Sequence, residues 1–280
     1  MTRGLKIRLR EVFIMKIIIC LFLALGLMLS SAIAEEKKYF HWVDDVDYPP
    51  LIYRGADGKP AGIFYEIMTD VFHRLDIPLK VEVYPWSRAQ KIVASGKADG
   101  MVTVLTDSRK QVFYGSDPIL LASEHIFVNK NNPRIKEIMA IRSLKAVLPF
   151  KVVEIIGSGW TKENLIGANI MWVPEMENAF NMLIKDRADI FIANRFTGAD
   201  FLQKKTREGG ASSEGYKNIV TNPHPLKTVA FRLLVQKDSS FVNIIDRFNE
   251  TIHQMQQDKT IQNILERTQL PQLDDAHNQR

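Results

Sequence analysis

The sequence predicts an α/β fold with two similar lobes, each a mainly parallel sheet flanked by helices. Helical and strand-like patterns alternate along the chain after residue 62, and such alternation is typical of parallel βαβ units with right-handed crossovers. The order of helix, basic-Ala-Asp tripeptide, apolar strand and polar loop also occurs twice, around Lys97-Ala98-Asp99 and around Arg187-Ala188-Asp189. This repetition favours two α/β lobes over a sandwich or a barrel.

The first half contains predicted strands at residues 41–43, 81–84 and 101–105. Apolar residues recur at every fourth position from Ile63 to Leu75, which predicts an amphipathic helix that ends before Pro78. Ser87 is expected to cap a second helix, which ends near Ser95.

The second half repeats this order, with predicted strands at residues 152–156, 170–173 and 190–193, and a later strand at 228–235. A short helix is expected from Thr161 and a longer one at residues 175–185. The Gly- and Ser-rich residues 208–215 predict an exposed loop. Two amphipathic helices at residues 241–252 and 261–265 have no counterpart in this half, so we expect them to return to the first lobe.

Residues 1–34 have the pattern of a cleavable secretory signal peptide. Lys16 precedes an apolar run of 13 residues from Ile17 to Leu29, and small residues ending at Ala34 complete the pattern. A helix that crosses a bilayer needs about 20 apolar residues, so an uncleaved membrane anchor is the weaker alternative. We expect a released, periplasmic protein, and we interpret residues 1–14 as an upstream start.

Charge and cysteine content exclude several classes of function. The chain has 37 Lys and Arg against 32 Asp and Glu, and five of those basic residues lie within residues 1–34. The exported part is therefore nearly balanced and has no basic stripe for nucleic acid. The single cysteine, Cys20, lies in the leader, so no disulfide or lipid-anchoring thiol is left. Without metal-ligand spacing or a phosphate-binding loop, the sequence predicts neither a metal nor another cofactor.

Four loops are candidates for a binding site, because ligands of open α/β sheets bind beyond the carboxyl ends of the strands. These loops follow the predicted strands and comprise residues 44–50, 106–109, 157–159 and 194–195. Two lobes that face each other would bring all four loops to one cleft.

Several short motifs in this order resemble family 3 extracellular solute-binding proteins, the periplasmic receptors of ABC importers for polar amino acids. The motifs are Tyr48-Pro49-Pro50, Asp57-Gly58-Lys59-Pro60-Ala61-Gly62, Pro85-Trp86-Ser87-Arg88-Ala89, Lys97-Ala98-Asp99-Gly100, Thr106-Asp107-Ser108-Arg109-Lys110 and Ser116-Asp117-Pro118. The resemblance implies a type II periplasmic-binding-protein fold. It also implies a monomer that delivers a small polar, carboxylate-bearing solute to an ABC permease in the inner membrane.

The resemblance also implies a division of the chain into two hinged lobes. Lobe 1 is expected to comprise residues 35–128 and lobe 2 residues 129–227, and residues 228–270 return to lobe 1 before a flexible tail at 271–280. Hinge segments are expected near residues 129–133 and 225–230.

The family's ligand-binding roles carry over to particular residues of this chain. Arg109 stands where the family's arginine holds a ligand carboxylate, because its planar fork can donate two parallel hydrogen bonds. Tyr48 matches an aromatic residue that stacks on the ligand, and Trp86 resembles an aromatic residue beside the cleft. Thr106, at the start of the Arg109 loop, and the loop Gly157-Ser158-Gly159 are further candidates. The alternatives are a surface arginine, core aromatic residues and a bare turn.

Two departures from the family pattern concern the ligand. Val104 stands five residues before the arginine, where amino-acid receptors usually have a hydroxyl residue, and Asn194 stands where they have an aspartate for the α-ammonium group. An amide does not offset a desolvated positive charge as a carboxylate does. Either Asp45 compensates or the ligand is not a standard α-amino acid. Arg195 favours a more anionic ligand unless it faces solvent.

The leading hypothesis is a binding protein without enzymatic activity. One alternative is an enzyme similar to the periplasmic cyclohexadienyl (arogenate) dehydratases found on this scaffold, with Asp45, Asp47 or Glu154 as the general acid. Another is a receptor that feeds a sensor kinase, since one fold serves both purposes.

Overall fold

The structure is a computed structural model that describes residues 39–209 and 213–268. The predicted signal peptide at residues 1–34, the upstream start at 1–14 and the tail at 271–280 lie outside the described residues. Among the residues that are described, no helix is both long enough and apolar enough to cross a membrane.

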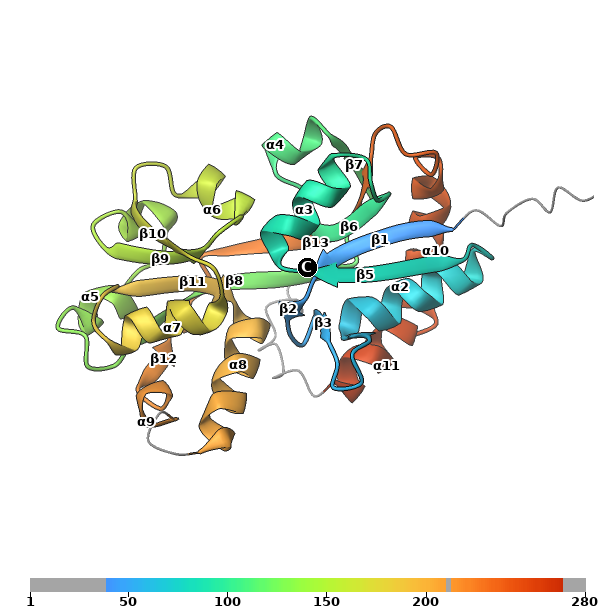
Figure 1. The fold of residues 1–280 in the computed structure, drawn as a ribbon. Coiled ribbons are helices and arrows are strands. Elements are labelled where there is room, and N and C mark those ends of the chain that lie inside the picture. The colour runs from blue at the N-terminus through green and yellow to red at the C-terminus, as the bar shows by residue number, and fades with distance from the viewer. Residues whose placement is uncertain (1–38, 210–212, 269–280) are drawn as a thin grey trace, which may run out of the picture. The chain divides into compact units, whose positions relative to one another are not determined.

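The predicted α/β class is confirmed, since helices cover both faces of a ten-stranded mixed sheet (Figure 1). Its strands are β1 (Phe40–Asp45), β5 (Leu79–Tyr84), β6 (Gly100–Val104), β7 (Phe113–Gly115), β8 (Leu120–Asn129), β9 (Lys151–Ile155), β10 (Asn169–Val173), β11 (Ile190–Asn194), β12 (Ile219–Thr221) and β13 (Lys227–Gln236). A small second sheet contains β2 (Asp47–Tyr48), β3 (Ile52–Arg54) and β4 (Pro60–Ala61).

The strand order of the main sheet is β10-β9-β11-β8-β13-β6-β1-β5. β1, β5 and β6 form one parallel group, and β9, β10 and β11 form another. The long strands β8 and β13 lie between the two groups and pair antiparallel with each other and with their neighbours. One continuous sheet therefore runs through both halves, and the strand topology alone does not separate two lobes.

The helices are α2 (Ile63–Arg74), α3 (Trp86–Ala94), α4 (Asp107–Lys110), α5 (Ile135–Met139), α6 (Gly159–Asn164), α7 (Met176–Ile184), α8 (Arg195–Glu208), α9 (Ser213–Tyr216), α10 (Ile244–Gln257) and α11 (Thr260–Arg267), with a 3-10 turn at Leu144–Val147. The predicted helices and strands are present within a few residues of their expected bounds. The structure adds β2, β3, β4, β7, β8, β12, α4, α5, α8 and α9, which the sequence analysis did not predict.

Two local predictions were wrong. Ser87 does not cap α3, because the helix begins at Trp86 after Pro85, and no side chain caps it. The predicted loop at 208–215 overlaps α9, where Ser213 and Tyr216 are buried. Tyr216 packs edge-on against Phe201 of α8, and this packing holds the short helix inward.

The C-terminal helices α10 and α11 pack beside α2. α2 buries one apolar side, and its Phe72 ring lies 6.4 Å from the ring of Phe248 in α10. Arg74 at the end of α2 forms a 2.8 Å ion pair with Asp258, between α10 and α11. Partial exposure makes the ion pair worth little, so burial of the apolar side is the main stabilising contribution.

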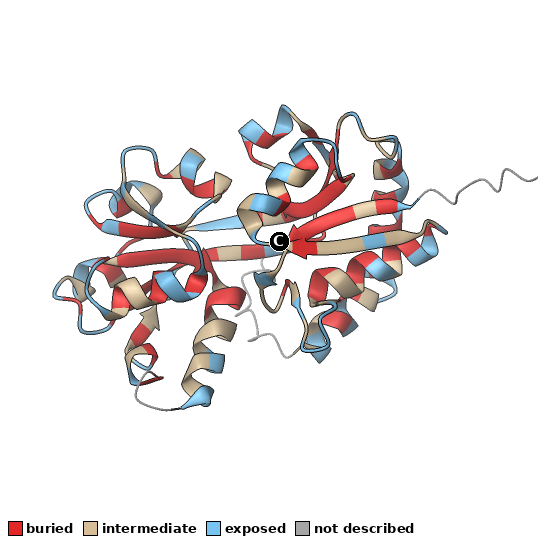
Figure 2. Cartoon of the chain, viewed as in Figure 1, coloured by how far each residue is buried: buried red, intermediate tan, exposed pale blue. Residues whose placement is uncertain are grey.

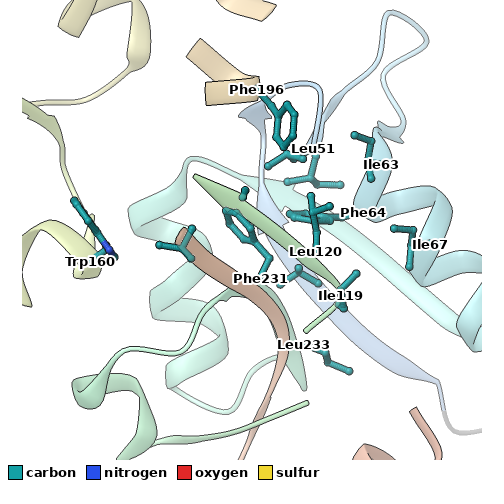
Figure 3. Close-up of a cluster of buried hydrophobic side chains, with 14 of the residues drawn as sticks. Leu51, Ile63, Phe64, Ile67, Ile119, Leu120, Trp160, Phe196, Phe231 and Leu233 are labelled. Atoms are coloured by element: carbon teal, nitrogen blue, oxygen red, sulfur yellow. The ribbon is translucent and has the colours of Figure 1, made fainter. Parts of the chain in front are cut away.

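The core follows the central strands, which are almost continuously buried (Figure 2). In a close-up of this core, Leu51, Phe64 and Phe231 form a packed group beside α2, and the rings of Phe64 and Phe231 lie 5.3 Å apart (Figure 3). Trp160 of α6 lies apart from that group and contributes to the wall of a cavity. The rigid sheet thus supports loops that can hold polar groups in a fixed arrangement.

Candidate functional site

A cavity of about 190 Å³ lies where β1, β6, β9 and β11 end. Its walls include Asp44 and Asp45 from the end of β1, Val104 from the end of β6 and Asn194 from the end of β11. Because all four are parallel strands that end beside loops or helix N-termini, the position agrees with the rule for ligand sites in open α/β sheets.

Six of the ten residues predicted for the site line this cavity, namely Asp45, Tyr48, Trp86, Arg109, Ser158 and Asn194. The other four lie just outside its lining. Thr106 caps α4, and Gly159 begins α6 next to the Arg109 guanidinium. Gly157 accepts hydrogen bonds at its carbonyl, and Arg195 is the first residue of α8.

Hydrogen bonds to residues of β6 and α3 hold the Arg109 side chain in a fixed orientation. Its Nη1 donates to Thr103 Oγ1 at 3.1 Å and to the Val104 carbonyl at 2.7 Å, and its Nη2 donates to Gln90 Oε1 at 2.7 Å. The guanidinium also lies over the Trp86 ring, 5.4 Å from the centroid. An arginine has five N–H donors, so the Nε–H and one Nη2 N–H stay available beside the cavity.

Burial is the main influence on the pKa of the Arg109 guanidinium. Its side chain is 8% exposed, and this desolvation lowers the arginine pKa to about 10 against the opposing effect of Glu163 and Asp44. The guanidinium therefore stays positively charged at neutral pH. A buried cation whose hydrogen-bond partners are a hydroxyl, a backbone carbonyl and a side-chain amide oxygen, all neutral, is suited to receive a carboxylate.

Asp44 is a buried residue of the site that the sequence analysis did not select. One of its oxygens accepts hydrogen bonds from Trp42 Nε1 and from the Val102 backbone N–H, both at 2.8 Å, and the other accepts from the Asp45 N–H. Burial outweighs these bonds and raises the Asp44 pKa to about 6. Its role is to join β1 to β6 below the cavity.

Besides Asp44, the cavity is lined by the exposed Asp47 and Glu175 and by three less exposed carboxyl groups, Asp45, Glu124 and Glu154. Burial is the largest influence on the pKa of each of these three. The pKa of Asp45 is raised to about 7, that of Glu124 to about 7, and that of Glu154 well above its usual range. Sequence analysis missed Glu124 because β8 itself was not predicted. Its segment, LLASEHIFVN, interrupts the apolar pattern with Ser, Glu and His.

Tyr48 lies among these three carboxyl groups. Burial raises the pKa of the Tyr48 phenol well above its usual value, and the nearby negative charges of Glu124, Asp45 and Glu154 raise it further. The phenol is therefore protonated at neutral pH and can donate a hydrogen bond. The cavity thus has an acidic region around Tyr48 and a cation at Arg109.

Two buried donors among the described cavity residues have no hydrogen-bond partner, Trp160 Nε1 and Asn194 Nδ2. The other side of the Asn194 amide is occupied, since its Oδ1 accepts from the Phe196 backbone N–H and so caps α8. A buried donor without an acceptor costs about 1–3 kcal/mol. Both donors could be satisfied by acceptor atoms of a bound molecule or by water.

Hydrogen bonds connect the two sides of the cavity, one formed by α3 and α4 and the other by α6 and the loop before it. Glu163 of α6 accepts hydrogen bonds from the Asp107 and Ser108 N–H groups and from Ser108 Oγ, at 2.8–3.0 Å. Trp86 Nε1 and Gln90 Nε2 donate to the Gly157 carbonyl at 3.3 and 3.1 Å. These contacts hold α6 and its loop against α3 and α4.

A mainly apolar cavity with a few converging polar groups at the strand ends of an α/β fold is typical of a small-molecule site. The chain belongs to family 3 of the bacterial extracellular solute-binding proteins, whose model matches residues 41–268.

Individual relatives agree with this membership. The L-cystine-binding protein TcyJ of Escherichia coli (strain K12) is 21% identical over 225 residues, which cover 79% of this chain and 78% of TcyJ. A histidine kinase sensor domain with similarity to periplasmic binding proteins superposes with a TM-score of 0.70 at 17% identity, covering 84% of this chain and 97% of that domain. An ancestral arginine-binding protein bound to arginine superposes with a TM-score of 0.67 at 18% identity, covering 83% of this chain and 99% of that protein. The two structural likenesses show a shared fold.

Proposed function

We propose that this protein is a periplasmic binding protein that encloses an amino acid, or a close analogue, and presents it to an ABC importer. The observation that carries the proposal is the position of Arg109 at the cavity. Three of its N–H groups are already bonded to the protein, so the guanidinium cannot rotate freely. The donors left beside the cavity suit the paired oxygens of a carboxylate.

The relatives support an amino acid as the ligand class. TcyJ is named for L-cystine, and the ancestral structure holds arginine. Both ligands combine a carboxylate with an ammonium group. The cavity of this chain offers charges of both signs, with Arg109 for the carboxylate and buried carboxyl groups for the ammonium group.

Closure would occur between two lobes, lobe 1 at residues 35–128 with its return at 228–270 and lobe 2 at residues 129–227. β8 and β13 are suited to connect them, because the first part of β8 pairs with β13 and its last part pairs with β11. The bonds of Glu163 to α4 would hold the closed form together. In this proposal a permease recognises that closed form.

An enzymatic function is the second candidate, and the buried acids favour it. Glu154 and Asp45 have raised pKa values and share the cavity with Arg109, so either carboxyl group could be protonated near neutral pH and act as a general acid. Incubation with prephenate and with L-arogenate tests this candidate. Formation of aromatic product by the wild-type protein, lost in Glu154→Gln, would replace the pure binding function.

The binding proposal is tested by a thermal-shift screen with the twenty standard L-amino acids and L-cystine. A ligand that binds only the native state raises the melting temperature. At a ligand concentration of 100 times Kd, it adds about 2.7 kcal/mol to the unfolding free energy. We expect at least one of these compounds to raise it in the wild type and in the exposed-site control Arg88→Gln, but not in Arg109→Gln. No response to any of them in the wild type would refute the proposal.

A further inference from the structure

Glu124 and Asn194 are direct neighbours across the β8–β11 pair. The two residues are Cα partners in the antiparallel register, so their side chains lie on the same face of the sheet. The Cβ atoms of such partners are about 4.5–5.5 Å apart. Both side chains line the cavity. A carboxyl group on β8 therefore lies next to the amide at the end of β11.

Asn194 is a poor partner for an ammonium group, because its side chain carries no negative charge. Its Oδ1 already accepts from the Phe196 N–H, and the unpartnered atom is Nδ2, which is a donor. An ammonium group is also a donor and needs an acceptor. The charge of a cation in this part of the cavity would therefore have to be offset by a different residue.

Glu124 has the properties that this role requires. Its side chain is 9% exposed, lines the cavity and has no hydrogen bond to any described residue. Its other register neighbour, Lys227, directs its Nζ away to Asn164 Oδ1 at 2.8 Å. Burial is the single cause that raises the Glu124 pKa to about 7. A buried carboxyl group without a partner is costly, and a bound cation would offset that cost.

The other acids around Tyr48 are engaged by the protein. Glu154 accepts from Thr161 Oγ1 at 3.0 Å and from the Ile192 N–H at 3.2 Å, one bond to each of its oxygens. Asp45 accepts from the Asp47 N–H at 3.1 Å. Asp47 and Glu175 also line the cavity, but both are exposed to solvent. Among the buried carboxyl groups of the cavity in the described part of the chain, Glu124 is therefore the one with both oxygens available.

We propose that Glu124 is the residue that binds the ligand's ammonium group, so that the negative charge missing at Asn194 is supplied from the neighbouring strand. The inference deepens the proposed function and depends on it. The ligand class is then a compound with a carboxylate held by Arg109 and an ammonium group held by Glu124, with the Tyr48 phenol beside it. Asn194 Nδ2 and Trp160 Nε1 would donate to acceptor atoms elsewhere on the ligand.

The experiment compares each amino acid with its deaminated counterpart by isothermal titration. The probe pairs are L-arginine with 5-guanidinopentanoic acid, L-glutamine with glutaramic acid, and, for any other amino acid that binds, the acid without the α-amino group. We expect Glu124→Gln to weaken binding of the amino acid about 30-fold or more, as removal of one partner of a buried charge pair does. Its affinity for the deaminated acid should stay within about threefold of the wild type.

A charge-relocation variant separates recognition from folding. Asn194→Asp combined with Glu124→Gln moves the carboxylate across the strand pair, and we expect it to recover at least about tenfold of the lost affinity. Retained binding of the deaminated acid by Glu124→Gln shows that the variant is folded.

The two proposals fail in different ways. If amino acids bind the wild type and bind Glu124→Gln equally well, the Glu124 proposal is overturned and the binding function stands. If the deaminated acids bind the wild type as tightly as the amino acids, the ammonium site is likewise overturned. If no amino acid binds the wild type, both proposals fail.

Discussion

Replacing Glu124 with glutamine should stabilise the empty protein at alkaline pH. The pKa of Glu124 is raised from 4.5 to about 7, with burial as the single cause. A difference of that size corresponds to about 3 kcal/mol of unfolding free energy that the ionised carboxylate costs the folded state. A buried glutamine amide has its own desolvation cost of about 1–2 kcal/mol, so we expect a net gain of about 1–2 kcal/mol at pH 8.

The direction of the pH dependence follows from the raised pKa. Between pH 4.5 and about 7 the folded state binds more protons at Glu124 than the unfolded state, so the stability of the wild type falls as the pH rises through this range. Below pH 4.5 the group is protonated in both states, and the advantage of Glu124→Gln should disappear. The charge of Glu124 also raises the pKa of Glu154 and of Tyr48, so its removal makes ionised Glu154 less costly in the folded state and acts in the same direction.

The assay is urea unfolding of the ligand-free proteins at pH 4, 6 and 8, with a thermal melt at each pH. A gain of 1–2 kcal/mol corresponds to a melting temperature about 2–8 °C higher for a protein of this size. Glu250→Gln, an exposed change on α10, serves as the control and should stay within about 0.5 kcal/mol throughout. A Glu124→Gln variant that is less stable than the wild type at pH 8, or whose advantage is the same at pH 4, would refute the reasoning.

Three other predictions concern stability. Arg109→Met removes three hydrogen bonds from a buried side chain and should lower the unfolding free energy by about 2–3 kcal/mol. Urea denaturation measures this change, with the exposed substitution Arg88→Met as the control. Equal unfolding midpoints for the two variants would contradict the buried position of Arg109. Burial alone would raise the Glu163 pKa, but hydrogen bonds from the Ser108 and Asp107 backbone lower it to about 2. The wild type should therefore be more stable than Glu163→Gln above pH 4.5, and urea denaturation should show this advantage disappearing as the pH falls towards 2. An advantage that grew on acidification would contradict this assignment. A Cβ at Gly198 would lie 2.2 Å from Phe127 Cζ, so Gly198→Ala should lower the unfolding free energy of the protein by about 1–3 kcal/mol. Adding Phe127→Leu should recover part of this loss. An unchanged melting temperature in Gly198→Ala would contradict the prediction and show that α8 is free to shift.

Much of the fold could be predicted because its signals are local. The apolar residues of α2 recur at helical spacing, and the Lys97-Ala98-Asp99 and Arg187-Ala188-Asp189 turns each precede a short apolar strand. Such patterns depend on neighbouring residues alone. β8 was missed because Ser123, Glu124 and His125 break the apolar pattern of a central strand, and of these three residues Glu124 lines the cavity.

The candidate site could be predicted only in part. Arg109, Tyr48 and Asn194 follow from strand-end positions and from the family motifs, and all three line the cavity. Glu124 carries no motif and lies in a strand without a strand-like sequence. Only the pairing of β8 with β11 places it beside Asn194.

The sequence by itself therefore determined the alternation of helices and strands, its repetition in the two halves of the chain and the position of Arg109 just after a strand, because each depends on residues close together along the chain. The tertiary structure alone decided which carboxyl groups are buried, which of them have hydrogen-bond partners and which one lies beside Asn194. Burial and register arise from segments that meet only after folding. The pKa of Glu124 and its place beside Asn194 depend on both.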